Sequence, residues 1–201
     1  GVGGEILGRK AGSFGDIGTT SFFPAKPLGC YGDGGALFTN DDDIAAMLRS
    51  LCVHGKGHDK YDNVRIGMNS RLDTIQAAIL LEKLAVFPQE IVLRNKLAQS
   101  YAEALSPKFN VPIVPEGYKS SWAQYTLRDN ERDIIMAKLK SNNIPTAIYY
   151  NKCMHQQTAF SDLPQISLGL AEAMSKTVFS LPMHPYLGSD DFDRIIETLF
   201  G

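Results

Sequence analysis

The sequence predicts an α/β fold. Segments rich in β-branched and aromatic residues alternate along the chain with segments whose apolar residues recur at helical spacing. The clearest helical segment is LDTIQAAILLEKL, where Leu72, Ile75, Ile79 and Leu81 lie on one broad apolar face. After residue 109 the expected order is strand, strand, helix, strand, helix, helix, which is typical of a small α/β domain.

The composition is that of a globular protein without a nucleic-acid or membrane partner. The 201 residues are 44% hydrophobic and 21% charged, and the formal net charge of -2 provides no basic field for nucleic acid or an anionic membrane. No apolar run reaches the roughly 18 residues of a membrane span. Cys30, Cys52 and Cys153 show no CxxC spacing, so we expect neither a zinc site nor a disulfide framework. A cytoplasmic, reducing compartment fits this cysteine usage best.

Five segments have the composition of strands. Residues 1–19 are rich in glycine and should form short strands and turns rather than a phosphate-binding loop. The strands expected after them are 19–23, 35–40, 110–115, 122–127 and 144–150.

The helices are predicted from capping residues and apolar periodicity. Asn40 or Asp41 is placed to cap a helix that ends near Leu51, and the polar loop CVHGKGHDKYDNVRIGMN follows it. A helix should begin near Arg71, break or kink at Pro88 and continue as a second helical stretch to about Leu105. Later helices are expected from an Asn130 cap to about Lys140, near 167–178 and near 189–200.

A domain boundary is expected near Ser106. It divides the chain into residues 1–105 and a small α/β domain of residues 106–201.

Lys26 has an unusual setting, in the segment TSFFPAKPLGCYGDGG. It follows an apolar strand and lies between Pro24 and Pro27, which stiffen the backbone. A lysine that forms a Schiff base must be neutral when it attacks, and burial beside a cofactor favours the neutral amine. Ser21, at the end of the strand, could donate to a phosphate, and the following glycines allow close approach to a ligand. By spacing alone, a surface lysine in a turn explains the segment equally well.

The segment SFFPAKPLGCYGDGG resembles the cofactor-lysine segment of the DegT/StrS nucleotide-sugar aminotransferases, which are fold-type I enzymes that use pyridoxal 5'-phosphate. The resemblance continues in the family's order through GALFTNDDDIA, HGK, RIGMNSRLDTIQAAIL, WAQYTL and SLPMHPYL. It implies that residues 1–105 are the C-terminal part of the large cofactor-binding domain. Within the family the chain is most similar to enzymes that aminate UDP-2-acetamido-2-deoxy-3-oxo-glucuronate for surface polysaccharides such as O-antigen and lipopolysaccharide.

The resemblance implies roles for four residues of the first part. Lys26 would hold the cofactor and carry a proton between the substrate carbon and the cofactor, and Ser21 would bind the phosphate. Asn69 and Arg71 would reach into the active site of a partner subunit, Asn69 towards the phosphate and Arg71 towards the substrate. A helix N-cap or turn role for Asn69 is an alternative. The resemblance therefore implies a homodimer with composite active sites.

Near the C-terminus, His184 and Tyr186 of LPMHPYL match a family segment near the substrate site, with a buried structural histidine as the alternative. Elsewhere the chain departs from the family pattern, because Asn151 and Cys153 replace two prolines. That leaves substrate contacts by Tyr150 and His155 open.

The function implied is transfer of an amino group from an amino acid, taken to be glutamate, to a nucleotide-linked keto sugar. The family's carboxylate for the pyridine nitrogen would lie upstream of Gly1, and neither Asp16 nor Asp33 matches it. We therefore expect this chain to be an inactive fragment of such an enzyme. The alternative is a non-catalytic fragment or regulatory remnant that folds or dimerises without cofactor. Sugar 3-dehydratases of the same fold carry histidine in place of the lysine, so Lys26 argues against that class.

Overall fold

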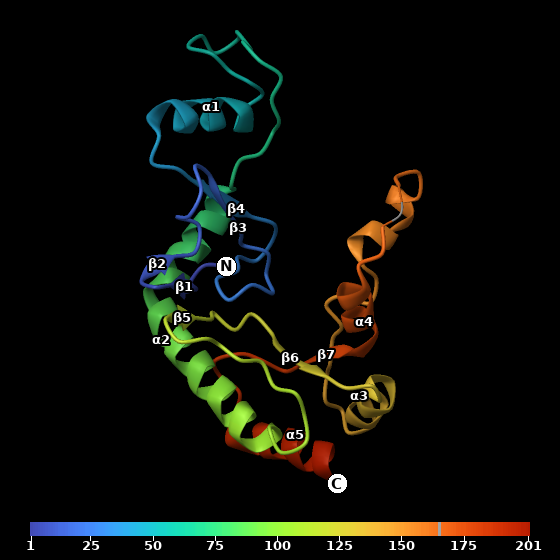
Figure 1. The fold of residues 1–201 in the computed structure, drawn as a ribbon. Coiled ribbons are helices and arrows are strands. Elements are labelled where there is room, and N and C mark those ends of the chain that lie inside the picture. Colours follow the sequence, from blue (N-terminus) through green and yellow to red (C-terminus); the bar gives the residue numbers. More distant parts are fainter. Residues whose placement is uncertain (165) are drawn as a thin grey trace. The chain divides into compact units, whose positions relative to one another are not determined.

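The computed structural model describes residues 1–164 and 166–201 and contains both helices and short strands (Figure 1). Two compact units are present. The first contains Gly1–Val92 and Val114–Ala123, and the second contains Leu93–Ile113 and Gln124–Gly201. The division into functional domains 1–105 and 106–201 remains a prediction, because a compact unit need not be a functional domain.

The first unit contains a small antiparallel sheet in the order β2-β1-β5. Its strands are β1 (Glu5–Ile6), β2 (Arg9–Lys10) and β5 (Tyr118–Lys119). The register places Glu5 opposite both Lys10 and Lys119, and its carboxylate forms ion pairs with both ammonium groups. The short strands expected in residues 1–19 are confirmed.

The Lys26 loop connects the two strands of a second sheet. Strand β3 (Gly18–Ser21) pairs antiparallel with β4 (Gly35–Phe38), and the register places Ser21 opposite Gly35. Both strands lie within the predicted segments 19–23 and 35–40 apart from Gly18, and β3 ends before Pro24, which has no backbone N–H to donate.

Helix α1 (Asp42–Cys52) begins at the cap that the sequence indicates. The Asp41 carboxylate accepts a hydrogen bond from the Ile44 N–H at 2.9 Å, so Asp41 rather than Asn40 is the N-cap. The polar segment that follows contains no helix or extended strand within the described residues. The single bridges Val53–Asn69 and Lys56–Asn63 fold it back on itself.

Helix α2 (Thr74–Leu105) continues through Pro88, so the predicted break is wrong, while the alternative of a kink stays a prediction; the helix begins later than Arg71. Proline removes one backbone donor but does not end the helix here. Phe87 is 5% exposed and forms the core of the first unit with Leu28, Cys30 and Leu80, while Val2, Phe22 and Ile91 pack against this core.

The second unit contains a two-stranded antiparallel sheet, three further helices and two short 3-10 turns. Its elements are β6 (Tyr125–Arg128), α3 (Arg132–Ser141), η1 (Met154–Gln156), η2 (Thr158–Phe160), α4 (Gly169–Thr177), β7 (Val178–Leu181) and α5 (Ser189–Phe200). The helices expected near 167–178 and 189–200 are confirmed. At the core, the Tyr101 ring packs against Tyr125 and Phe192, with centroid distances of 4.8 and 5.1 Å, and its hydroxyl donates to the Pro182 carbonyl.

Two of the expected strands do not form. Residues 110–115 and 144–150 make only the single bridges Asn110–Arg128 and Ala147–Ser180. Both segments contain proline, which cannot donate to a strand ladder, so pairing stops at one bridge. The expected strand 122–127 is shifted to Tyr125–Arg128, and β7 was not predicted.

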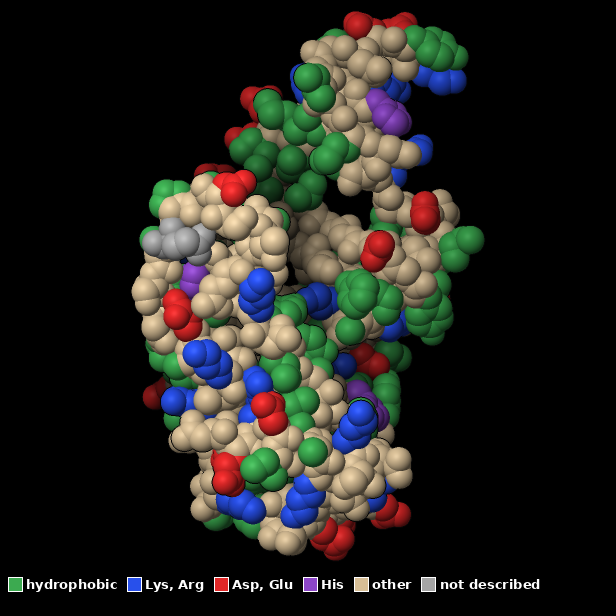
Figure 2. All heavy atoms as spheres, turned by 90° about the vertical axis from the view of Figure 1, so that its right-hand side faces the viewer, with side chains coloured by type: hydrophobic (Ala, Val, Ile, Leu, Met, Phe, Trp, Pro, Cys, Tyr) green, Lys and Arg blue, Asp and Glu red, His purple; other side chains and the backbone are tan. Residues whose placement is uncertain are grey.

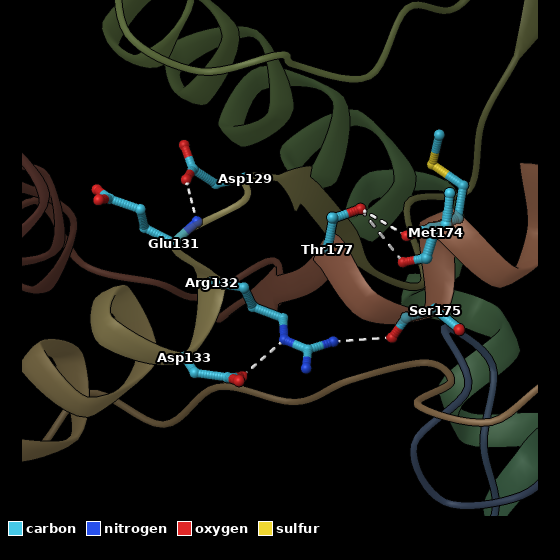
Figure 3. Close-up of polar contacts among 8 residues, drawn as sticks. Asp129, Glu131, Arg132, Asp133, Met174, Ser175 and Thr177 are labelled. Carbon is cyan, nitrogen blue, oxygen red and sulfur yellow. Dashed lines mark hydrogen bonds and ion pairs between the residues drawn. The ribbon is translucent and has the colours of Figure 1, made fainter.

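The predicted Asn130 cap is also wrong. Helix α3 begins at Arg132 without a side-chain cap, and the Asp129 carboxylate accepts from the Glu131 N–H at 2.7 Å (Figure 3). Arg132 then joins α3 to α4, because its guanidinium donates to the Ser175 carbonyl and to Asp133, both at 2.8 Å. Thr177 closes α4 by donating to the Ala173 carbonyl.

Apolar side chains are visible at the molecular surface (Figure 2). In the first unit, α1 contains no buried residue, Met47 on it is 53% exposed, and Leu37 and Phe38 of β4 are each 44% exposed. Within the described residues, none of the helices has the length and apolar character needed to cross a membrane, and no cluster of metal-binding side chains occurs.

Candidate functional site

The Lys26 loop is closed by backbone hydrogen bonds at its base. The Phe22 N–H donates to the Gly34 carbonyl at 2.7 Å, and the Cys30 N–H donates to the Phe22 carbonyl at 2.8 Å. The buried Cys30 thiol lies 3.1 Å from the carbonyl oxygens of Phe22 and Gly32 and can donate to one of them at a time. The loop therefore has a fixed base.

Lys26 itself is presented to solvent from this base. Its N–H donates to the Phe23 carbonyl at 2.8 Å in a tight turn, its side chain is exposed, and residues 27–30 behind it are buried. Among residues 1–164 and 166–201, no ion pair engages its amine. The setting combines a fixed backbone with an accessible amine.

Ser21 lies at the end of β3, where this loop begins. Its side chain is exposed, and its hydroxyl oxygen accepts from the Phe23 N–H at 3.2 Å. The hydroxyl proton stays available for an incoming acceptor such as a phosphate oxygen.

Asn69 and Arg71 lie next to each other ahead of α2. Both are exposed, and the Arg71 guanidinium donates to the Asn69 side-chain oxygen at 3.1 Å. Because α2 begins at Thr74, Asn69 is not its N-cap, so the cap alternative is wrong. Instead, Asn69 pairs with Val53 at the neck of the polar loop.

Arg71 also lines a cavity of about 700 Å³ in the first unit. The wall includes polar side chains of Asn40, Arg49 and Ser70 and apolar side chains of β4 and α1, while Lys26 and Ser21 do not contribute to it. This cavity and the Lys26 loop are therefore separate features of the unit.

His184 and Tyr186 lie in the second unit, between β7 and α5. The His184 ring nitrogen Nδ1 accepts from the Tyr186 N–H at 3.3 Å, and His184 lines a cavity of about 320 Å³ with Lys96 and Asp193. His184 is exposed, so the alternative of a buried structural histidine is wrong.

Two contacts of the Lys26 loop were not predicted from the sequence. One is the thiol of Cys30, and the other is the Gln76 side chain on α2, whose oxygen accepts from the Tyr31 N–H at 2.8 Å. Gln76 is a polar residue within the otherwise apolar IQAAIL stretch, and that irregularity was the available signal.

Comparisons with known proteins agree on one family. The profile of the DegT/DnrJ/EryC1/StrS aminotransferase family matches residues 1–200. A UDP-2-acetamido-2-deoxy-3-oxo-D-glucuronate aminotransferase from Pseudomonas aeruginosa is 44% identical over 98% of this chain and 55% of its own length. The chain thus spans about half the length of the curated relatives it matches.

Solved structures of similar proteins give the same result. A DegT DnrJ EryC1 StrS aminotransferase from Brucella abortus has 50% identity and a TM-score of 0.94, covering 98% of this chain and 54% of that one. DesV from S. venezuelae, solved with a ketimine intermediate, has 34% identity and a TM-score of 0.92 over the same shares. These matches confirm the α/β fold class and the resemblance read from the motifs. The chain belongs to the DegT/DnrJ/EryC1/StrS aminotransferase family.

Proposed function

We propose that this chain carries the cofactor lysine of a pyridoxal-phosphate-dependent aminotransferase, which moves an amino group from glutamate to a nucleotide-linked keto sugar. The observation that supports this most directly is that Lys26 is exposed on a loop whose base is fixed by hydrogen bonds. The family to which the chain belongs uses pyridoxal phosphate.

The residues present fit that cofactor. Substitution of a side chain at Gly29 would place a Cβ 2.6 Å from the Phe23 carbonyl oxygen, so the backbone here is packed too closely to tolerate one. This packing fixes the Lys26 backbone without covering its amine. The Ser21 hydroxyl lies at the start of the same loop and can donate to a phosphate.

When bound, pyridoxal phosphate supplies an electron sink that stabilises negative charge on the substrate carbon. Lys26 would hold the cofactor through its amine, and the same amine would carry the proton taken from the substrate carbon. A base placed in this way contributes roughly 10²–10⁴-fold to proton transfer. Ser21 would donate its hydroxyl to the phosphate, and Asn69 of a partner subunit would add a side-chain amide.

The substrate proposal follows the P. aeruginosa relative, whose name specifies a UDP-linked 3-oxo-glucuronate. Such a substrate carries a sugar carboxylate and a diphosphate, and an arginine is the side chain best suited to either anion. Arg71 is exposed, and among the described residues its side chain donates from Nε to Asn69, which leaves its terminal N–H groups for an anion. His184 with Tyr186 would complete the contacts to the sugar. The proposed role is synthesis of surface polysaccharide.

The proposed assembly is a homodimer with composite sites. Asn69 and Arg71 lie at the exposed neck of a long polar loop, which is a geometry that can reach a neighbouring subunit. A two-fold axis would then give two equivalent sites.

Selective trapping of Lys26 tests the proposal. The chain is incubated with a limiting amount of pyridoxal phosphate, the lysine–aldehyde bond is fixed with borohydride, and modified peptides are counted by mass spectrometry. We expect Lys26 to be modified ahead of Lys60, which is also exposed but lies in the polar loop. The Lys60→Ala variant should leave Lys26 labelling unchanged. Equal labelling of the two lysines would contradict the assignment.

A further inference from the structure

We infer that Gln76 is a positioning residue for Lys26. It adds a hydrogen bond between the far side of the Lys26 loop and helix α2 to the buried contact that Leu28 and Cys30 make with the same helix. The inference rests on the proposed function of Lys26 and adds a residue to it.

The first attachment is the buried side of the loop. Leu28 and Cys30 pack with Leu80 of α2, and Cys30 also engages the carbonyls of Phe22 and Gly32 through its thiol. This attachment restrains the residues that directly follow Lys26.

The second attachment is polar and lies one helical turn earlier on α2. Gln76 and Leu80 are four positions apart and therefore lie on the same helix face. The half-buried Gln76 side chain accepts from the Tyr31 N–H at 2.8 Å, although the Tyr31 side chain is 76% exposed. Without that bond, the contact of Tyr31 with α2 that remains among the described residues is the Lys83 ammonium over its ring, 5.5 Å from the ring centroid.

Two glycines that follow Tyr31 make close contacts, Gly32 with helix α2 and Gly34 with the loop's own Cys30. A Cβ at Gly32 would lie 3.0 Å from the Gln76 amide nitrogen, and a Cβ at Gly34 would lie 2.9 Å from the Cys30 sulfur. The loop sequence thus leaves room for both attachments.

The position of Gln76 also relates the two parts of the proposed site. Gln76 lies in the first turn of α2, directly after the segment that carries Asn69 and Arg71. A movement of that segment with the start of α2 would therefore be transmitted to the Lys26 loop through the Gln76–Tyr31 bond.

The test compares Gln76→Ala, which removes the acceptor, with Gln76→Glu, which keeps an oxygen at the same place. Gln99→Ala serves as the matched control, because Gln99 lies on the same helix and bonds only to Glu103 one turn later among the side-chain contacts described. Hydrogen exchange of the Tyr31 amide is measured without cofactor. Loss of one net hydrogen bond should speed exchange by about two- to tenfold in Gln76→Ala and leave Gln76→Glu and Gln99→Ala near wild type.

The second readout is the preference for Lys26 over Lys60 in borohydride trapping with pyridoxal phosphate. Gln76→Ala should lower that preference by about two- to tenfold, and Gln76→Glu should restore it. Unchanged Tyr31 exchange, or an unchanged Lys26 preference in Gln76→Ala, overturns the positioning role. No preference in the wild type instead refutes the proposed function of Lys26, and the positioning role with it, whatever the exchange result shows.

Discussion

The Lys26 side chain is exposed while the residues behind it are buried, so the position of its amine is set by the backbone and by neighbouring side chains. The lysine, the serine and the prolines of this segment could be recognised from sequence, because they lie within a few positions of one another. The Gln76–Tyr31 bond joins residues 45 positions apart, and no local pattern specifies such a pair. The candidate lysine could thus be proposed from the sequence, whereas the Gln76 side chain that contacts its loop could not.

A second residue-scale feature is the contact between His155 and Glu172, with the histidine Nε2 and the carboxylate oxygen 3.1 Å apart. The same Glu172 oxygen accepts from the Leu168 N–H at 2.8 Å, ahead of α4. The pKa of Glu172 lies below its usual value of 4.5. The largest cause is the hydrogen bond from the Leu168 N–H, and the next is the hydrogen bond with His155. The contact links η1 to the start of α4, a role for His155 that does not require substrate.

The lowered pKa of Glu172 predicts a pH dependence of stability. Its ionised form is favoured by folding, so its contribution is fully present above pH 4.5 and is lost as the pH falls through the lowered pKa of the folded state. Wild type should therefore unfold at higher urea than Glu172→Gln at about pH 7, with the difference shrinking towards about pH 3. Urea unfolding followed by circular dichroism measures this, and Glu197→Gln, an exposed glutamate on α5, is the control. A difference that grows as the pH falls would contradict the assigned sign.

At the scale of elements, the predictions that succeeded rest on signals contained within one segment. Helix α1 follows its acidic cap, and α4 and α5 follow their apolar periodicity. One failed strand prediction shows the role of a partner that lies elsewhere in the chain. Residues 144–150 look like a strand, but only Ala147 bridges to Ser180 of β7. Whether a strand forms depends on its neighbour, which a single segment does not reveal.

The cap of α1 gives an element-scale prediction. Asp41→Ala removes the acceptor for the Ile44 N–H and should destabilise α1 by about 0.5–2 kcal/mol. Because α1 buries no residue, the change should appear as faster local hydrogen exchange in its amides rather than as global unfolding. Asn40→Ala is the matched control, since Asn40 does not cap the helix. Equal effects of the two variants would show that Asp41 is not the dominant cap.

Pro88 gives the opposite prediction. It is exposed within α2 and provides no backbone N–H, so its replacement restores a helical hydrogen bond with little loss of packing. Pro88→Ala should stabilise the chain by about 1–3 kcal/mol in urea unfolding. Gln89→Ala, at the adjacent exposed position, should change stability by much less. A destabilised Pro88→Ala variant would show that the ring makes contacts which outweigh the missing bond.

At the scale of the whole molecule, the chain matches about half the length of its relatives. The sequence motifs predicted the family because they occur in a fixed order along the entire chain, and the family comparison confirms it. How Lys26 and Arg71 of the first unit combine with His184 of the second remains a prediction, since each unit is described by itself.

We expect the 201-residue chain alone to bind pyridoxal phosphate weakly and unproductively. Ser21 and a neighbour's Asn69 would offer the phosphate a few hydrogen bonds, each worth roughly 0.5–1.5 kcal/mol net. That is too little to hold a solvated dianion at micromolar concentration, because a Kd of 1 μM corresponds to about 8 kcal/mol. The equilibrium absorbance band of bound cofactor should therefore form only at cofactor concentrations far above micromolar.

Titration with pyridoxal phosphate, followed by absorbance, measures this affinity, and addition of glutamate tests for release of pyridoxamine phosphate. Lys26→Ala provides the baseline for aldehyde bound at other amines. A stoichiometric absorbance band that saturates at micromolar cofactor, is missing in Lys26→Ala and yields pyridoxamine phosphate with glutamate would contradict the expectation. In that case this chain, by itself or as an oligomer, would contain a complete cofactor site, and the residues that hold the pyridine ring would have to be found among its own 201.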